Sequence, residues 1–491
     1  MLLRSKQPGS PSLVRSIRAE SKKLETASDE QLKSNSLELV YEIADGLNLD
    51  RTVARAFGLA IEASRRTVGQ VHYDVQIVAG IELLKGNICE MKTGEGKTLS
   101  AIPPLYVMAL QKRGCHLATA NDYLAERDSE FARPIFKALG FSTGTITGDS
   151  SWQERFAAYR CDVTYGTAKE FGFDFLRDEM AKAAGNQTCI PSLSNILIDE
   201  ADSLLIDEAR TPLIIGAIDQ AKEAQRTQVC NWAEKHAQRF LEGRDFKYHE
   251  KTRRIEFLPT GVLTLRGLQE TQHTRQLSLR ELGEYIENTI RVYRDYHRDQ
   301  QYAVVDGEIM IIDEFTGRPA EGRQWQKGIH QAVEAKENLE ITPRTERAAS
   351  ITVQALVNQY DFICGMTGTA WTSRKEFRRV YKKRVVRIPT HRPSIRKKIP
   401  TQVFATEDSK FQEIAKQIKS FCLQGRSVLV GTRTLDKSEQ LSACLTSLGI
   451  AHNVLNANQL EKEAALVADA GLPGRVTVAT NMAGRGTDIS L

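Results

Sequence analysis

The sequence has no run of about 18 apolar residues, the minimum for a helix that spans a bilayer. Its first residues, MLLRSKQPGSPSLVRSIR, are basic but lack the apolar core of a secretory signal. The eight cysteines form no C-x-x-C pair, which argues against a zinc site or a disulfide framework and fits a reducing compartment. The net charge of +5 over 491 residues is too small to indicate a nucleic-acid partner by itself.

A glycine-rich motif, MKTGEGKT, occupies residues 91–98 between an apolar run and a helix-compatible run. Strand, glycine loop and helix N-terminus together present backbone N–H groups to a polyphosphate. Lys97 is predicted to reach the β- and γ-phosphates, and the Thr98 hydroxyl to bind Mg²⁺. Met91 stands where the usual motif has its first glycine. The sequence therefore predicts a nucleotide-binding protein.

A strand-like segment ending in Asp199 and Glu200 predicts a carboxylate for the Mg²⁺ shell and a base for the attacking water. The same letters recur at 206–209 (IDEA) and 311–314 (IIDE). We assign the role to Asp199 and Glu200 because a clean apolar strand precedes them and Ala201-Asp202 completes a DEAD box. The other two copies are interpreted as structural carboxylates.

Three further features allow two interpretations each. Residues 13–45 suggest an amphipathic helix whose Arg15, Arg18, Lys22 and Lys23 either touch anionic lipid or form the solvated face of a packed helix. Residues 374–398 hold twelve Lys and Arg against one acid, and a solvated linker between two lobes is slightly favoured over a lipid or nucleic-acid contact. Thr367 and Thr369 either sense the γ-phosphate or form a simple turn.

The remaining chain alternates strands and helices, with one interruption. Residues 51–86 look helical, and strands are expected near 115–119, 163–165, 195–198, 427–431, 452–455 and 476–479. Residues 362–370 are expected to form a strand followed by a turn. The interruption is predicted as helix 218–243, hairpin 244–260, helix 277–299 and a hairpin turning at 306–307. The predicted domains are a first lobe at 1–216, an inserted α+β domain at 217–342, a return to the first lobe with a linker at 343–395, and a second lobe at 396–491.

Longer strings carry a family resemblance. Two α/β lobes with a phosphate loop, a DEAD box and GRGTD resemble a superfamily 2 helicase-type motor. The strings MKTGEGKT, NDYLAERD, TYGTAKEFGFDFLRD, IDEARTPLII, IHQAVEAKE, GMTGTA, HNVLNA and ATNMAGRGTD resemble the SecA family, the ATPase motors of bacterial preprotein translocation. The resemblance implies an α/β fold class with two RecA-like P-loop NTPase lobes, the second incomplete, and an inserted preprotein-crosslinking-like domain.

The resemblance also implies roles at matched positions. Gln76, whose amide has donors and an acceptor, would contact adenine; Asp199 and Thr98 would hold Mg²⁺ and Glu200 would activate water. The phosphates of ATP would lie on Gly94, Glu95, Gly96, Lys97 and Thr98, while Arg485 and Asp488 would approach from the second lobe. The implied partners are the SecYEG channel, unfolded preproteins held near 217–340, an anionic membrane surface and a second copy in a homodimer. The implied location is cytoplasmic, at the inner face of the bacterial plasma membrane.

The chain departs from the family pattern at its end. The Arg-rich motif that supplies arginine fingers is not in the sequence, and such a finger is worth roughly 10³–10⁵ in rate. We therefore expect ATP binding with impaired hydrolysis. Residues 458–460, NQL, also replace the family's Lys-Gln-His.

Two other functions are consistent with the motifs. One is a DEAD-box nucleic-acid helicase, disfavoured because no aromatic and basic platform for single strands is evident. The other is a nucleotide-gated polypeptide-binding module that does not hydrolyse ATP.

Overall fold

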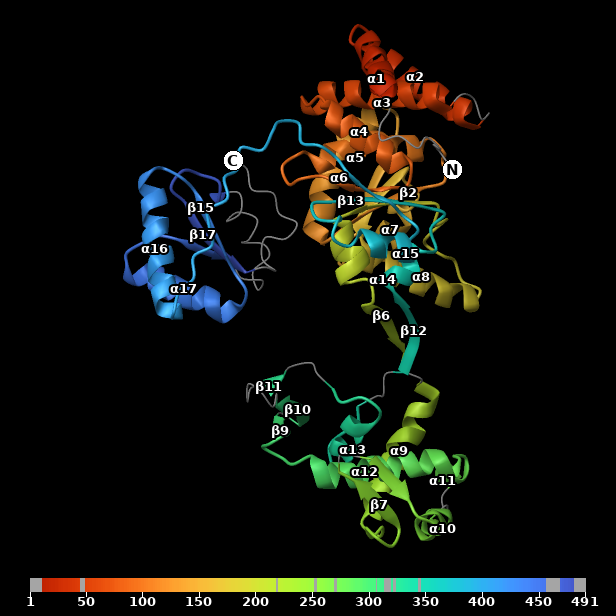
Figure 1. Cartoon of the computed structure of the whole chain (residues 1–491). Coiled ribbons are helices and arrows are strands. Elements are labelled where there is room, and N and C mark those ends of the chain that lie inside the picture. The colour runs from red at the N-terminus through yellow and green to blue at the C-terminus, as the bar shows by residue number, and fades with distance from the viewer. Residues whose placement is uncertain are drawn as a thin grey trace. The chain divides into compact units, whose positions relative to one another are not determined.

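The computed structural model describes residues 11–44, 49–217, 220–250, 254–268, 272–305, 307–312, 319–320, 324–342, 346–455 and 469–480. The chain divides into two compact units, Met1–Leu213 with Ser350–Leu491, and Ile214–Ala349. Figure 1 labels the helices and strands of both.

The N-terminal segment forms two helices, α1 (Pro11–Leu24) and α2 (Asp29–Ala44), so the prediction of one helix over 13–45 is wrong. The break falls at Ser28. Its backbone N–H donates to Gln31 Oε1 (2.9 Å), and its hydroxyl accepts from the N–H of Gln31 (3.2 Å). This reciprocal pair caps the start of α2. The apolar side of α1 packs on α3 (Leu49–Val68).

The helix expected over residues 51–86 is also two helices, α3 and α4 (Asp74–Leu84). Gly69, with φ of 69°, ends the first of them in a conformation that favours glycine. Arg18 fixes the start of α4, since its guanidinium donates to the Asp74 carboxylate (2.7 Å) and to the carbonyl of His72 (2.6 Å). For Arg18, therefore, the packed-helix interpretation is the one observed.

A parallel sheet of seven strands forms the centre of the first lobe, in the order β14-β1-β13-β5-β2-β4-β3. Its strands are β1 (Ile88–Glu90), β2 (Cys115–Thr119), β3 (Thr143–Thr145), β4 (Val163–Thr167), β5 (Asn195–Asp199), β13 (Phe362–Thr367) and β14 (Val385–Arg387). The inner strands are buried on both faces, which is why they read as apolar runs in the sequence.

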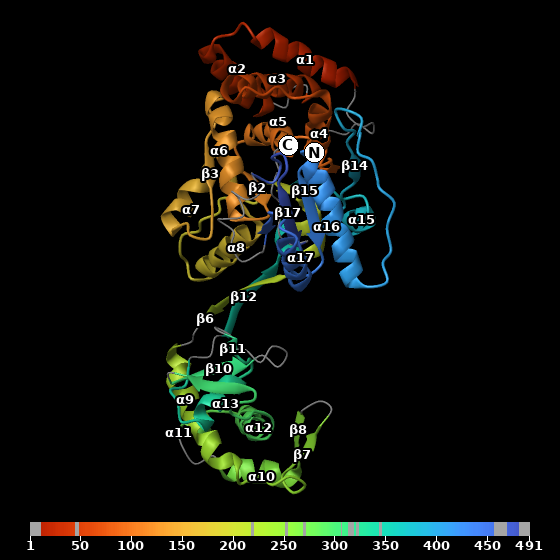
Figure 2. The same cartoon turned by 90° about the vertical axis from the view of Figure 1, so that its left-hand side faces the viewer.

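Helices cover both faces of this sheet (Figures 1 and 2). Leu197 of β5 packs in the core with α3, α4, α5 (Lys97–Ala109) and α6 (Asp122–Ala138). Its neighbours Ile196 and Ile198 pack in the opposite core, with α7 (Trp152–Ala158), α8 (Ala168–Ala183), α14 (Val353–Val357) and α15 (Arg374–Val380). The alternation follows from the period of two along a strand.

The chain leaves the first unit along β6 (Pro212–Ala217) and returns to it along β12 (Glu346–Thr352), and these two strands pair with each other. The helices of the second unit are α9 (Gln220–Ala237), α10 (Pro259–Gly267), α11 (Gln272–Arg275), α12 (Leu279–Asp295) and α13 (Ile329–Lys336). Its strands are β7 (Phe246–His249), β8 (Arg254–Phe257), β9 (Tyr302–Val305), β10 (Glu308–Ile312) and β11 (Pro319–Ala320). Both predicted hairpins are confirmed, and Asp306 of the second turn lies outside the described residues.

A second lobe follows residue 406. It contains α16 (Glu407–Leu423), β15 (Val428–Thr432), α17 (Leu435–Ser447), β16 (Asn453–Leu455) and β17 (Val476–Thr480), with the strands parallel in the order β15-β17-β16. Apolar side chains of α16, α17 and β17 form its core. Residues 458–460 lie outside the described part of the chain.

All eight cysteines are free thiols, and five of them are buried. Across the described residues, no helix combines the length and the apolar character needed to cross a bilayer.

The buried His116 predicts acid sensitivity. Its Nδ1 lies 2.7 Å from the Tyr360 hydroxyl, and burial lowers the pKa of its imidazole to about 4. Between that value and the unfolded pKa of about 6.5, the unfolded chain binds a proton that the folded protein does not, so stability falls as the pH falls. We expect this residue to contribute a loss of roughly 2 kcal/mol between pH 7 and pH 4.5. Denaturant unfolding of His116→Gln across that range should lack this loss, whereas His297→Gln, at an exposed histidine, should keep it.

Candidate nucleotide-binding site

The glycine-rich loop lies between the end of β1 and the start of α5, as predicted. Gly94 and Gly96 have φ values of 85° and 76°, which favour glycine. A Cβ on Gly94 would meet nothing within 4 Å among the described residues, whereas one on Gly96 would lie 2.4 Å from Gln76 Nε2. Gly96 is the N-cap of α5, and no side chain of the described residues caps this helix. The first-turn N–H groups are therefore suited to an anionic ligand.

Gln76 holds the loop against α4. Its Oε1 accepts from the N–H of Tyr73 (2.8 Å), and its Nε2 donates to the carbonyl of Glu95 (2.9 Å). The side chain is buried. Its amide thus joins the first turn of α4 to the loop, and contact with adenine stays a prediction.

Lys97 forms an ion pair with Glu200, the residue that follows β5. Asp199 ends that strand and is buried, and burial raises the pKa of its carboxyl to about 7. The nearby Lys97 opposes this shift, and the negative charge of Glu200 adds to it. The structure thus brings one lysine and two carboxylates together across 103 positions of sequence.

The backbone at Glu200 adopts φ of 49°, in the left-handed region that a side chain other than glycine rarely occupies. The chain then continues into a π-helix, η1 (Ser203–Asp207). Strained residues and π-turns concentrate at functional sites because the surrounding structure must hold them.

Asp202, the last residue of the DEAD box, accepts hydrogen bonds from two threonines. Thr367 at the end of β13 donates to Oδ1 (2.5 Å), and Thr369 donates to Oδ2. These hydroxyls therefore link the turn after β13 to the segment after β5. Their role as γ-phosphate sensors stays a prediction.

The competing Asp-Glu copies lie in different settings. Asp207 is the last residue of η1 rather than of a strand, and the half-exposed Glu208 pairs with Lys169 at 3.7 Å. Only the first half of the third copy is described: Ile311 and Ile312 end β10, and residues 313–314 lie outside the described residues. Arg485 and Asp488 also lie outside them.

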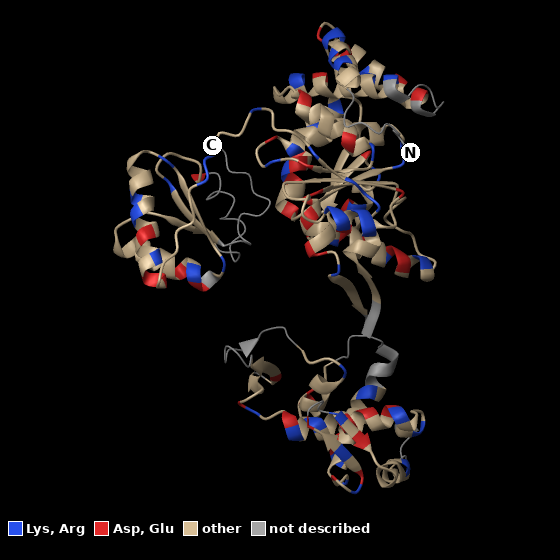
Figure 3. Ribbon diagram, in the orientation of Figure 1, with Lys and Arg blue, Asp and Glu red and all other residues tan. Residues whose placement is uncertain are grey.

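The basic run 374–398 is more structured than a linker. Its first part forms α15, on which Lys and Arg gather (Figure 3), and β14, an edge strand of the large sheet. Within the run, residues 381–384 and 388–398 form neither helix nor strand. A linker is therefore observed from Ile388 onward.

The residues at the loop fit a nucleoside triphosphate with Mg²⁺. The helix N-terminus after Gly96 and the Lys97 ammonium suit a polyphosphate. The Thr98 hydroxyl and the Asp199 carboxylate are oxygen donors, the ligands that Mg²⁺ prefers.

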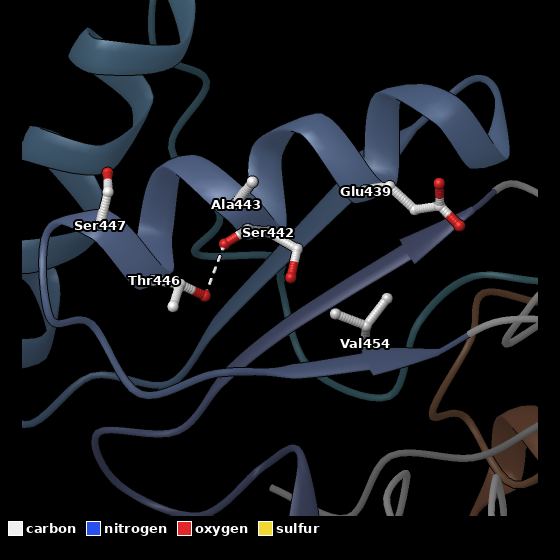
Figure 4. Close-up of a pocket in the computed structure, with 6 residues that line it drawn as sticks. All are labelled: Glu439, Ser442, Ala443, Thr446, Ser447 and Val454. Carbon is white, nitrogen blue, oxygen red and sulfur yellow. Dashed lines mark hydrogen bonds between the residues drawn. The ribbon is translucent and has the colours of Figure 1, made fainter.

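Two cavities lie elsewhere. One of about 690 Å³ is lined by residues that precede β2, β4, β5 and β13, such as Gly114, Asp162 and Asp361, and so lies at the opposite edge of the sheet from the loop. The other, of about 580 Å³, lies beside α17 and β16 and is lined by Glu439, Ser442, Ala443, Thr446, Ser447 and Val454 (Figure 4). The second lining carries no cation, so it does not suit phosphate.

Sequence reasoning missed five residues around the loop. The Glu90 carboxylate accepts from the N–H of Trp371 (2.6 Å) and from Arg387 Nε (3.0 Å), and the ring of His391 stacks on Tyr73. About 300 positions separate each pair in the chain, and no local motif marks them.

Comparison with known proteins places these features in a family context. Residues 4–378 match a family model described as the SecA DEAD-like domain, and residues 393–491 match the SecA P-loop domain. The chain is 47% identical over 495 residues to "Protein translocase subunit SecA 2" of Rhodopirellula baltica, covering 95% of this chain and 75% of that protein. It is 44% identical over 479 residues to "Protein translocase subunit SecA" of Carboxydothermus hydrogenoformans, covering 97% of this chain and 54% of that protein.

Solved structures are more distant. The DUF1998 helicase MrfA bound to DNA superposes with a TM-score of 0.42 at 12% identity, over 88% of this chain and 45% of that one.

Proposed function

The chain belongs to the SecA family, and on that premise we propose that it binds ATP with Mg²⁺ and hydrolyses ATP to drive unfolded secretory proteins through the SecYEG channel. The chain spans about half the length of the second relative and three quarters of the first, so the activity and partners of the whole protein are part of this proposal. The convergence of Lys97, Asp199 and Glu200 on one glycine loop is the observation that carries it.

The ion pair between Lys97 and Glu200 suggests how the site changes on binding. The γ-phosphate competes with Glu200 for the Lys97 ammonium, because both are anions within its reach. Once released, the Glu200 carboxylate accepts a proton from the attacking water as the bond between the γ-phosphorus and the bridging oxygen breaks. Thr98 and Asp199 would hold Mg²⁺, which would supply positive charge to the phosphate oxygens. Gln76 contacts the adenine in this proposal. Arg485 and Asp488 approach the nucleotide from the second lobe.

We assign the polypeptide to the unit Ile214–Ala349. Exposed apolar side chains on it, including Leu241 and Leu263, suit an unfolded chain that has not buried its own apolar groups. We assign an anionic membrane surface, at the inner face of the plasma membrane, to the exposed basic residues of α1, which are Arg15, Lys22 and Lys23. A second copy of this chain, in a homodimer, is also proposed as a partner.

Nucleotide binding and turnover test the core of the proposal. We expect wild-type protein to bind a fluorescent ATP analogue in the presence of Mg²⁺. The variant Lys97→Ala should lose both binding and phosphate release, because the loop keeps its backbone donors but loses its cation. Lys182→Ala, an exposed lysine paired with Glu179 on α8, is the matched control and should behave as wild type.

The identity of the partner is tested by what stimulates turnover. SecYEG vesicles with an unfolded preprotein should raise phosphate release, and single-stranded RNA should not. Stimulation by RNA alone would indicate a helicase. The wild-type protein could instead bind nucleotide but release no more phosphate than Lys97→Ala, even with vesicles and preprotein. That result would indicate a binding module that does not hydrolyse ATP.

A further inference from the structure

Two glutamates bracket the phosphate loop, and both hold a distant part of the chain. Glu90 ends β1 and is buried. It accepts from the N–H of Trp371 (2.6 Å), just after the threonine-bearing turn, and from Arg387 Nε (3.0 Å) at the end of β14. The Arg387 guanidinium also lies over the Trp371 ring, 4.4 Å from its centre. This contact fixes the position at which the linker begins.

Glu95, inside the loop, holds the linker itself. Its Oε2 accepts from the backbone N–H of His391 (2.8 Å), and its carbonyl accepts from Gln76. The ring of His391 stacks on Tyr73, with centroids 3.7 Å apart and planes 17° apart. One residue of the loop is thus bonded both to α4 and to the linker. Hydrogen bonds to an ionised carboxylate are stronger than those between neutral groups.

Beyond His391 the side chains of the linker are exposed, up to Val403. Ile395, Ile399 and Val403 are 93%, 63% and 92% exposed, and Arg392, Arg396, Lys397 and Lys398 are exposed too. His391 is therefore the last anchored residue before an open stretch. The contacts of His391 with Glu95 and Tyr73 therefore limit the motion of the exposed linker residues that follow it.

We propose that Glu95, Tyr73 and His391 form a clamp that couples occupancy of the phosphate loop to the linker, with Glu90 and Glu95 as positioning residues. The inference rests on the proposed nucleotide binding at this loop. The clamp holds the loop in the conformation that suits phosphate, with an uncapped helix N-terminus and open space at Gly94. A ligand that favours this loop conformation therefore also favours the clamp. By linkage, the clamp must strengthen binding by the same factor.

The exposed Arg and Lys residues of the linker make trypsin a direct probe. Trypsin does not cut the Arg392–Pro393 bond, so the informative fragments are those that end at Arg396, Lys397 or Lys398. They are identified by mass, with and without a non-hydrolysable ATP analogue and Mg²⁺. We expect the analogue to slow this cleavage in wild-type protein by about fivefold or more, the usual scale of such coupling.

Two variants at one position provide the comparison. His391→Ala keeps the backbone donor but removes the stacked ring, and it should speed cleavage without nucleotide, weaken analogue binding and abolish the protection. His391→Phe keeps an aromatic ring on Tyr73 and should restore all three. Because His391 lies on the exposed linker, neither change should affect folding. An unchanged midpoint of denaturant unfolding would verify this.

The outcomes separate the clamp from the proposed function. Analogue binding of equal strength in wild type and His391→Ala, with equal cleavage, would overturn the clamp and leave nucleotide binding intact. Failure of wild-type protein to bind the analogue would overturn the proposed function and the coupling with it. Faster cleavage of wild type when the analogue is bound would also contradict the clamp.

Discussion

Replacing Glu200 by Gln is expected to lower ATP turnover by roughly 10²–10⁴-fold, the usual contribution of a positioned general base. The amide keeps the shape of the side chain but cannot accept the proton of the attacking water. ATP binding should survive, because Lys97 and the loop backbone remain and the variant frees Lys97 from its ion pair. Single-turnover phosphate release with saturating ATP, beside equilibrium binding of the fluorescent analogue, separates these effects.

The chain supplies a matched control for this experiment. Glu208 belongs to the second Asp-Glu copy, follows a π-helix and is half exposed. Glu208→Gln makes the same chemical change eight residues away and should leave turnover within about twofold, since an exposed charge of this kind contributes little. Full turnover in Glu200→Gln with a large loss in Glu208→Gln would show that the roles are reversed.

Much of the fold was predictable because its signals are local. Strands β2, β4, β5 and β13 are buried on both faces and so read as apolar runs, and Asn121 caps α6 by accepting from the N–H of Leu124 (2.9 Å). The predicted class, RecA-like P-loop NTPase lobes in a mixed α/β chain, is confirmed by the family models and the parallel sheets. The hairpins of the inserted unit are likewise confirmed.

The helix predictions were wrong where a single residue separates two helices. Helical periodicity continues across Ser28 and Gly69, so composition alone did not indicate that α1 and α2, or α3 and α4, are separate. The prediction of a linker over the whole basic run failed for a similar reason. Val385–Arg387 is a strand because it pairs with β1, a contact that the local sequence does not indicate.

The candidate site was only partly accessible from sequence. The motifs marked Lys97, Asp199 and Glu200, and the fold brings them together because β1 and β5 flank β13. The left-handed backbone of Glu200 and the bonds of Glu90 depend on contacts between distant segments, which no local spacing encodes.

Replacing Arg155 by Ala is expected to destabilise the protein by about 3–5 kcal/mol, because the buried Asp174 loses its buried guanidinium and keeps only Tyr159 and the exposed Arg177 as donors. Arg155 is 5% exposed and donates through Nη1 to both Asp174 oxygens, at 3.1 and 2.9 Å. Through Nη2 it reaches Glu170 (2.7 Å) and the carbonyl of Thr147 (2.7 Å), so it ties α7 to α8 and to the loop before α7. Urea unfolding of the first lobe, followed by Trp fluorescence, measures the loss.

A double replacement separates a buried charge penalty from a general packing defect. Asp174→Leu alone should also destabilise the protein, since it removes one of the two carboxylate partners of a buried guanidinium, and Arg155→Met alone should destabilise it as Arg155→Ala does. The double variant Arg155→Met with Asp174→Leu should be more stable than either of these single variants. Arg160→Ala, the exposed arginine five residues along, should change stability by less than about 0.5 kcal/mol. If the losses of the single variants simply added in the double variant, Arg155 and Asp174 would be acting independently. The network would then not hold α7 on α8.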